Sequence, residues 1–409
     1  MPTDLAATLR AFHTARASWQ PAEAAPPALH AVLSGRYVAT PAGECFLVEH
    51  QYPLAHRHGA LALERGVALT HVTRQVLAHA AGGAFDPAHA VFLDTETTGL
   101  AGGTGTYAFL VGLGFLDGDR FVVQQLFMRH PRDEPALLQA LSATLGRFPA
   151  WITFNGKAFD GPLLATRFRC ASRTPLPAPT HHLDLLPLAR RLWRSRLRSC
   201  ALGTLERALL GVSRATDIPS WQIPEAYFAY VRRGEVARLP AIFAHNAADI
   251  LSMAALLGYL DDVFREPQRY AGRLDPVGGV RLLQRAGLQR DAAAWGRGVL
   301  AALPIDEQRQ LRWELAVLCQ RLGALAEAAA HWRCLAQSGG PWAILALEAL
   351  AKHYERHEHD YVAARRAAET ALTALALYPN PSGPAVRERL ERRLGRLWFR
   401  SRLTGGGPK

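Results

Sequence analysis

The strongest constraint on the fold is the alternation of strand-like and helix-like segments between residues 90 and 260. Short apolar runs predict strands at residues 91–93, 107–115, 120–128, 151–154 and 181–186. Segments with helical periodicity lie at residues 134–145, 162–169, 202–210 and 240–260. The Asp117-Gly118 pair predicts the turn of a hairpin between the second and third strands. Strands and helices mixed in one stretch predict a mixed sheet covered by helices, an α/β domain.

The chain has 409 residues, which is long enough for two or three domains. After a Pro/Ala-rich linker at residues 21–27, short alternating runs predict an N-terminal β-rich region within residues 1–88. The α/β domain is expected at residues 89–265. Strand signals then vanish, and we expect an all-α repeat domain at 272–380 and a basic C-terminal helix and tail at 381–409.

The repeat prediction rests on a recurring pattern. Gly287, Gly323 and His357 each separate two helix-like segments and are followed by alanine-rich stretches, at spacings close to the ~34-residue tetratricopeptide unit. The pattern indicates three degenerate repeats, with an ordinary helical bundle of accidental spacing as the alternative. The arginine-rich helix at residues 387–402 contains Trp398 and Phe399, so it is compatible with nucleic-acid binding and equally with a solvated helix that caps the repeats.

Charge and composition narrow the class of protein. The formal net charge is +12, mostly from arginine, and predicts a polyanionic partner, although arginine-rich composition also accompanies GC-rich genomes. The five cysteines are scattered and form no CxxC pair, which argues against a disulfide framework or a zinc knuckle. We found no signal-type segment and no apolar run of membrane length, so we expect a cytoplasmic protein without a membrane partner.

Two carboxylates follow the first apolar strand of the α/β region. Asp94 and Glu96 are two residues apart, so on a strand they point to the same side. Like charges so close together raise a pKa or destabilise the fold unless a cation neutralises them, and a hard divalent ion is the usual solution. Alternatively, Asp94 starts a turn and Glu96 is solvated.

A third acid follows the strand at residues 151–154. Asp160 comes after the Asn155-Gly156 turn and shortly before Pro162, a residue suited to opening a helix. A carboxylate there could act in the same cluster. The alternative is an electrostatic role at the N-terminus of the helix.

A histidine and a fourth acid share one face of the helix from Pro240. His245 and Asp249 are four residues apart, whereas the apolar stripe of that helix lies roughly opposite to them. This stripe comprises Phe243, Ala247, Ile250 and Ala254. The polar pair therefore faces away from the main apolar side, as either a functional pair or a surface pair.

Taken together, these motifs resemble the DEDD exonuclease superfamily on the ribonuclease H fold. The residues that carry the resemblance are Asp94-Thr-Glu-Thr-Thr-Gly-Leu100, Asn155-Gly-Lys-x-Phe-Asp160 and His245-Asn-x-x-Asp249, in the order of the family. With Gly102-Gly-Thr-Gly-Thr-Tyr107 and Asp217-Ile-Pro219, the chain is similar to the YprB-like ribonuclease-H-type branch over about residues 30–265. A tetratricopeptide-like C-terminal region also fits that branch.

The resemblance implies a metal-dependent nuclease, most simply a 3'-5' exonuclease that hydrolyses phosphodiester bonds of DNA or RNA with two Mg2+ or Mn2+ ions. It implies that the metal ligands are Asp94, Glu96, Asp160 and Asp249, and that His245 is the general base. Thr97, Asn155 and Lys157 are expected to contact substrate. There are two alternatives: a structure-selective endonuclease on the same fold, and a nucleic-acid-binding scaffold with a weak or idle site. The repeats are expected to bind a protein partner.

One spacing departs from the family pattern. The histidine-bearing DEDD subgroup usually has four residues between its histidine and the final aspartate, whereas this chain has three, as in the tyrosine-bearing subgroup. The sequence therefore supports His245 as general base less strongly than it supports the four acids as metal ligands. A run of five arginines within residues 190–198 is the preferred patch for the substrate backbone, with a solvated helix as the alternative.

Overall fold

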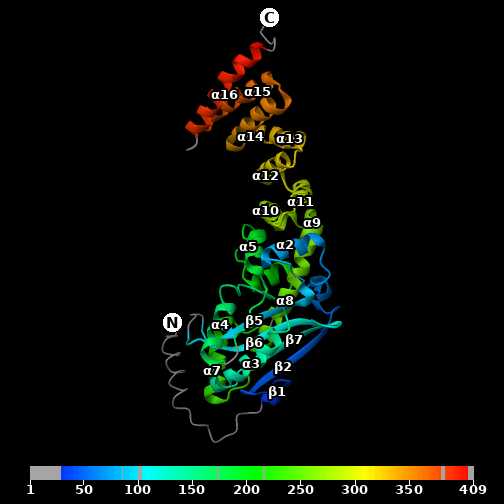
Figure 1. Ribbon diagram of the computed structural model, residues 1–409, viewed down its shortest axis with the longest axis vertical. Coiled ribbons are helices and arrows are strands. Elements are labelled where there is room, and N and C mark those ends of the chain that lie inside the picture. The colour runs from blue at the N-terminus through cyan, green and yellow to red at the C-terminus, as the bar shows by residue number, and fades with distance from the viewer. Residues whose placement is uncertain are drawn as a thin grey trace. The chain divides into compact units, whose positions relative to one another are not determined.

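The computed structural model describes residues 29–84, 86–99, 104–172, 175–214, 217–378 and 383–403 (Figure 1). The Pro/Ala-rich linker expected at residues 21–27 lies outside the described residues, as do Gly102 and Gly103 of the segment that carries part of the family resemblance. The chain divides into two compact units, residues 1–265 and residues 266–409.

A seven-stranded mixed sheet forms the centre of the first unit, in the order β1-β2-β7-β6-β5-β8-β9. Its strands are β1 (Gly35–Thr40), β2 (Gly43–Pro53), β5 (Ala90–Thr97), β6 (Ala108–Asp117), β7 (Arg120–Phe127), β8 (Ala150–Thr153) and β9 (His181–Asp184). Strands β1, β2, β7, β6 and β5 pair antiparallel, whereas β5, β8 and β9 pair parallel. The predicted mixed sheet is therefore confirmed.

The N-terminal strands belong to this same sheet. Strand β2 pairs along its length with β7, from Phe46 opposite Phe127 to Pro53 opposite Arg120, and β1 forms the sheet edge beyond it. The expected boundary between residues 88 and 89 is consequently wrong as a domain boundary, because β1 and β2 extend the antiparallel side of the same sheet. A small hairpin of β3 (Arg57–His58) and β4 (Leu61–Ala62) is separate from it.

Helices cover both faces of the sheet (Figure 1). Alternation along β5 sends Val91, Leu93 and Thr95 to the face covered by α3 (Glu134–Leu145) and α4 (Asp160–Ala171), and sends Asp94 and Glu96 to the face crossed by α8 (Leu239–Arg265). The other helices of this unit are α2 (His71–Ala81), α5 (Leu185–Trp193), α6 (Leu202–Leu205) and α7 (Ile223–Arg233). A π-helical turn, Glu206–Leu210, continues α6.

Helix α8 corrects one expectation about apolar segments. By length and composition, residues Leu239–Arg265 could cross a membrane, so the inference that no such run exists is wrong. In the fold, 72% of its most apolar window is buried, because the helix passes between the sheet and the segments packed on its outer side. It has the surroundings of a core helix.

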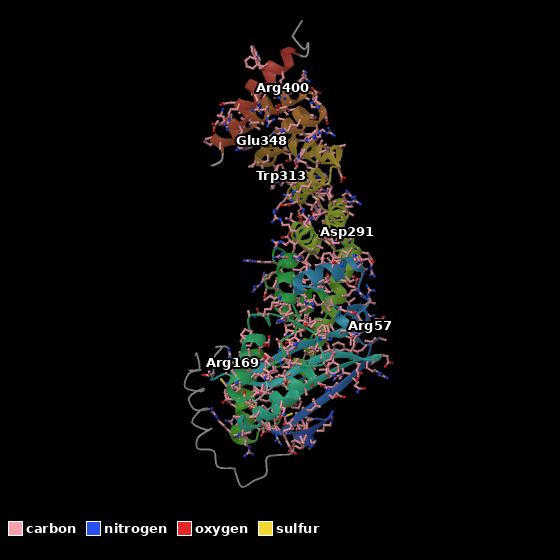
Figure 2. All side chains as sticks on the ribbon, viewed as in Figure 1. Arg57, Arg169, Asp291, Trp313, Glu348 and Arg400 are labelled. Carbon is pink, nitrogen blue, oxygen red and sulfur yellow. The ribbon has the colours of Figure 1, made fainter. Side chains whose placement is uncertain are left out.

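In the described part of the second unit, every regular element is a helix. Figure 2 shows its side chains together with those of the first unit. After α9 (Pro267–Tyr270), three helical hairpins pair α10 (Pro276–Arg285) with α11 (Gln289–Ala302), α12 (Gln308–Arg321) with α13 (Leu325–Ala336), and α14 (Gly340–His353) with α15 (Tyr361–Leu377). The residues of positive φ in the three turns are Gly287, Gly323 and His359, each 36 residues after the previous one. A helical repeat domain is confirmed, with His359 rather than His357 at the third turn.

The last helix, α16 (Gly383–Leu403), packs on α15. Several of its arginines pair with two buried acids of the preceding hairpin. Arg389 donates to both oxygens of Glu348, and Arg393, itself buried, donates to Glu355. These pairs favour the capping role over the nucleic-acid-binding role for this helix.

Candidate active site

The end of strand β5 places the first two acids. Asp94 lies opposite Gly112 and Glu96 opposite Leu110 of β6, and the ladder is irregular between Glu96 and Thr97. Bulges of this kind end regular pairing and redirect side chains next to active sites. Asp94 and Glu96 are two residues apart on the strand, so both carboxylates project from the α8 side of the sheet, as their spacing predicts.

Asp160 comes from α4, the helix that covers the face of the sheet opposite to α8. It lies in the first turn of α4, and the Thr95 hydroxyl donates a hydrogen bond of 2.5 Å to its Oδ1. The preceding turn is fixed by Asp184 at the end of β9, whose carboxylate accepts from the backbone N–H groups of Asn155 and Lys157. Asp184 therefore positions this turn, although it is not part of the motif at residues 155–160.

Asp94 is held by a buried amide on α8. Asn246, fully buried, donates from Nδ2 to Asp94 Oδ2 over 2.8 Å, and its Oδ1 accepts from Gln125 Nε2 over 2.9 Å. Gln125 also donates to the backbone carbonyl of Phe243. A Cβ at Gly112 would stand 2.2 Å from Asn246 Oδ1, so the absence of a side chain there lets α8 approach the sheet.

Asp249 faces a partly buried arginine. Arg214 donates from Nη2 to Asp249 Oδ1 and to Glu206 Oε1. Glu206, 2% exposed, lies in the π-helical turn and also accepts from the Ser252 hydroxyl, which in turn contacts His58 Nε2 at 2.6 Å. Sequence reasoning missed Arg214 and Glu206, since both come from a loop and a turn far from α8 in the chain.

His245 has a carboxylate partner of its own. Its Nδ1 lies 2.7 Å from Asp217 Oδ1, and its Nε2 lies 3.7 Å from Asp249 Oδ2. When Nδ1 carries the proton donated to Asp217, Nε2 is left to accept another. Asp217 therefore orients the ring and selects the tautomer.

Burial and mutual repulsion set the ionisation of the acids. Burial, followed by the charges of Asp249, Glu96 and Asp160, raises the pKa of Asp94 well above its ordinary value. Burial also raises the pKa of Glu96 to about 8 and that of Asp160 to about 6. The pKa of Asp249 is raised by burial as well, although Arg214 and His245 oppose the change. Four acids that resist ionisation together form a place where a cation is stabilised.

The charge on His245 follows from the same cluster. Burial alone would lower the pKa of its imidazole, but the carboxylates of Asp249, Glu96 and Asp217 outweigh burial and raise it. A cation bound among the acids would weaken this effect. The ring would then be neutral over more of the physiological pH range.

The donor set fits hard divalent ions. Asp94, Glu96, Asp160 and Asp249 offer carboxylate oxygens, the donors that Mg2+ and Mn2+ prefer. Three of these acids each have one oxygen engaged by a neighbouring donor, namely Asn246, Thr95 or Arg214. Each donor engages a single oxygen of its acid, so a metal on the second oxygen would leave the bonds from Asn246 and Thr95 in place, whereas Arg214 would compete with it at Asp249.

The expected substrate contacts have different surroundings. Thr97 is buried, and its hydroxyl donates to the backbone carbonyl of Gly99. Asn155 is exposed with φ of 68°, and Lys157 is exposed with Nζ 3.3 Å from the carbonyl of Ala80. Asn155 and Lys157 thus remain accessible, whereas the Thr97 side chain is committed to the turn that follows β5.

An antiparallel triplet β7-β6-β5 continued by parallel β8 and β9, with acids at the end of the central β5, is the arrangement of a ribonuclease-H-like fold. Residues 91–261 match the RNase_H superfamily. The chain is also 30% identical over 336 residues to "Uncharacterized protein YprB" of Bacillus subtilis (strain 168), with 81% of each chain covered. It therefore belongs to the ribonuclease H superfamily, in the YprB-like family. This membership supports a hydrolase that acts on nucleic acids and uses divalent metal ions.

Proposed function

We propose that this protein is a metal-dependent exonuclease that removes nucleotides from the 3' end of DNA or RNA by a two-metal-ion mechanism. The observation that carries the proposal is the placement of Asp94 and Glu96 at the end of β5, close enough to Asp160 and Asp249 that these two carboxylates raise the pKa of both. Like charges gathered in this way cost stability unless a cation neutralises them. A binding role alone gives no reason for them.

Each residue has a distinct task in the proposed mechanism. Asp94, Glu96 and Asp249 would hold the ions from the α8 side, and Asp160 from the α4 side. When bound, the two ions would activate the attacking water and stabilise the leaving oxygen. His245 Nε2 accepts the proton of that water, while Asp217 keeps Nδ1 protonated and stabilises the imidazolium that forms.

We propose that the substrate binds exposed polar and cationic side chains of the first unit. Asn155 and Lys157 are exposed on the turn that leads to Asp160, so both can meet phosphate oxygens. The five arginines of residues 190–198 are all exposed, on α5 and the segment after it. They offer guanidinium groups for the backbone of a single strand.

The test uses the pure full-length protein with end-labelled single strands of DNA and of RNA and added Mn2+ or Mg2+. We expect stepwise shortening from the 3' end and loss of at least about a thousandfold in rate in Asp94→Asn, because a proposed metal ligand is changed. Asp119→Asn is the matched control, since its side chain is 91% exposed on the β6–β7 turn. Unchanged activity in Asp94→Asn would refute the proposal.

Two alternatives are separated by further measurements. Cleavage of a circular single strand would indicate a structure-selective endonuclease on the same fold. Nucleic-acid binding without any divalent-ion binding in calorimetry would indicate a scaffold with an idle site. The cytoplasmic location and the absence of a membrane partner stay predictions, which fractionation of cells that produce the tagged protein would test.

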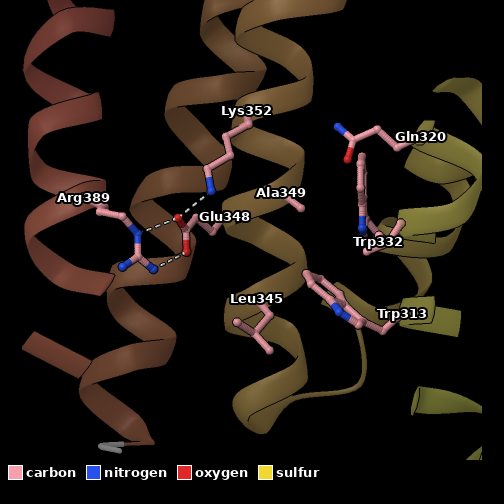
Figure 3. Close-up of a pocket in the computed structure, with 9 residues that line it drawn as sticks. Trp313, Gln320, Trp332, Leu345, Glu348, Ala349, Lys352 and Arg389 are labelled. Atoms are coloured by element: carbon pink, nitrogen blue, oxygen red, sulfur yellow. Dashed lines mark hydrogen bonds and ion pairs between the residues drawn. The ribbon is translucent and has the colours of Figure 1, made fainter. Parts of the chain in front are cut away.

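We also propose that the helical repeats bind a protein partner. A pocket of about 350 Å3 between α12, α13, α14 and α16 is lined by Trp313, Trp332 and Leu345 (Figure 3). Lys352 and Arg389 lie at its side, both bonded to Glu348, so the three charges leave one positive. A peptide with an apolar side chain next to an acidic one fits this chemistry. Selection of displayed peptides on the full-length protein, repeated with Leu345→Glu, would test it.

A further inference from the structure

The helical unit contains a second group of ligand-type side chains, apart from the residues used in the proposed nuclease mechanism. Cys319 lies near the end of α12, and Glu327 and His331 lie on α13. One ligand atom from each lies within 4.8 Å of those from the other two. Glu327 and His331 are four residues apart on one helical face, and the Gly323 turn folds α12 back so that Cys319 meets that face.

His331 gives the group its direction. The residue is 8% exposed, and its Nε2 is fully buried with no hydrogen-bond partner among the described residues. The nearest carboxylate oxygen, Glu327 Oε1, is 3.8 Å away, too far for a hydrogen bond. A buried imidazole nitrogen without a partner is destabilising. The side chains grouped with His331 offer a sulfur and a carboxylate oxygen, which are also metal ligands.

Two arginines neighbour this group, and they act on Glu327 and on His331. Arg297 on α11 donates from Nη1 to both oxygens of Glu327, at 2.9 and 3.1 Å, and so fixes the carboxylate. Burial and the neighbouring Arg312 lower the pKa of His331, so its ring is neutral and offers a lone pair. Burial and Glu327 raise the pKa of the Cys319 thiol to about 11, so an ion that binds the sulfur must displace its proton.

We propose that Cys319, Glu327 and His331 form a binding site for a transition-metal ion, with Zn2+ as the best fit. The ligands would be a thiolate sulfur, a carboxylate oxygen and an imidazole nitrogen, a mixed set that suits zinc and excludes Mg2+ and Ca2+, which take oxygen ligands. One thiolate and one carboxylate supply two negative charges, of which the charge of Glu327 is shared with Arg297. Glu327 is one-third exposed, so its side leaves the fourth position open to water.

The expected effect of the ion is structural. It would connect the two helices of the middle hairpin at the side chains flanking their turn, and through Arg297 it would reach α11 of the preceding hairpin. The site is independent of the proposed nuclease function, because none of its residues belongs to the acid cluster. Its failure and the failure of the exonuclease proposal are therefore separate results.

The experiment is a Co2+ titration of the full-length protein in the presence of excess Mg2+, which occupies oxygen-only sites. We expect one equivalent of Co2+ to produce a thiolate-to-cobalt charge-transfer band in the near ultraviolet, and added Zn2+ to remove it. Cys319→Ser should abolish the band, and His331→Gln should weaken Co2+ binding by at least about tenfold. Cys334→Ser is the matched control, because that cysteine is exposed on α13 and outside the group.

Two results would overturn the proposal. The first is a wild-type protein that shows no thiolate band at saturating Co2+. The second is a band of full intensity in Cys319→Ser, since the sulfur would then come from another cysteine. Serine is nearly isosteric with cysteine, and circular dichroism of the variants confirms that a lost band does not reflect unfolding.

Discussion

Replacing Gly112 with alanine should push α8 away from the sheet at the point where Asn246 donates its hydrogen bond to Asp94. The three nearest atoms to the new Cβ would be the side-chain amide atoms of Asn246, the closest at 2.2 Å. Overpacking of this kind costs about 1–3 kcal/mol of unfolding free energy. Activity should fall as well, because the amide that orients the Asp94 carboxylate has to move.

A double-mutant cycle gives this prediction its magnitude. Asn246→Ala alone removes the donor to a buried carboxylate, at a cost of about 1.5–3 kcal/mol. It also removes all three atoms that the Gly112→Ala methyl group would meet. In the Asn246→Ala background, alanine at position 112 should therefore cost much less, which gives a coupling energy of about 1–3 kcal/mol.

The assay is urea unfolding read by pulsed hydrogen exchange on peptides of α8, so that only the first unit is followed. Gly114→Ala is the matched control, because its Cβ would meet Ile250 and Phe121 but not the Asn246 amide. Its coupling to Asn246→Ala should be clearly smaller. Equal coupling for Gly112→Ala and Gly114→Ala would refute the proposed contact between the glycine and the amide.

Three further predictions concern charges. Arg214→Met should cost about 3–5 kcal/mol in urea unfolding, because Glu206 is then a buried charge without a cationic partner, and a second change of Glu206 to glutamine should recover part of the loss. Because the pKa of Glu96 is raised to about 8 in the fold, its contribution to stability is complete below its unfolded value and is lost as pH rises through about 8. The urea midpoint of the first unit in EDTA should therefore fall over that range, and Mg2+ should flatten the dependence; a midpoint that rises with pH would contradict the reasoning. Asp217→Asn should remove one of the carboxylates that raise the pKa of His245, so the acid limb of kcat/KM should move to lower pH, and an unmoved profile would exclude Asp217 as its positioning residue.

The sequence predicted most of the local structure, because local periodicity determines it. The helix predicted at residues 134–145 has those bounds in the structure, and the hairpin of β6 and β7 turns at Asp117-Gly118 as expected. The pairing of β2 with β7 could not be predicted in this way. It joins residues about 75 positions apart, and nothing in the pattern of either strand names its partner.

The candidate acids could be predicted from their order and spacing, whereas their partners could not. Asn246 and Asp217 stand in the family motif without a stated role, and only the fold brings them against Asp94 and His245. One available signal was overlooked. Gly112 and Gly114 interrupt a strand of large apolar residues, and such glycines indicate close approach of another segment.

The far end of α8 has a consequence for the site that lies outside any list of active residues. A Cβ at Gly258 would stand 2.7 Å from Arg65 Cβ, and one at Gly66 would stand 2.3 Å from the carbonyl oxygen of Ala254, so glycine at these two positions lets the two segments approach closely. Nine residues of helix separate Gly258 from Asp249, about 14 Å. A straight helix moves as one body, so a methyl group added at position 258 would shift Asp249, His245 and Asn246 together. Variants there should keep their substrate affinity and fold but lose rate, and natural variation at this remote position should be as restricted as at the acids.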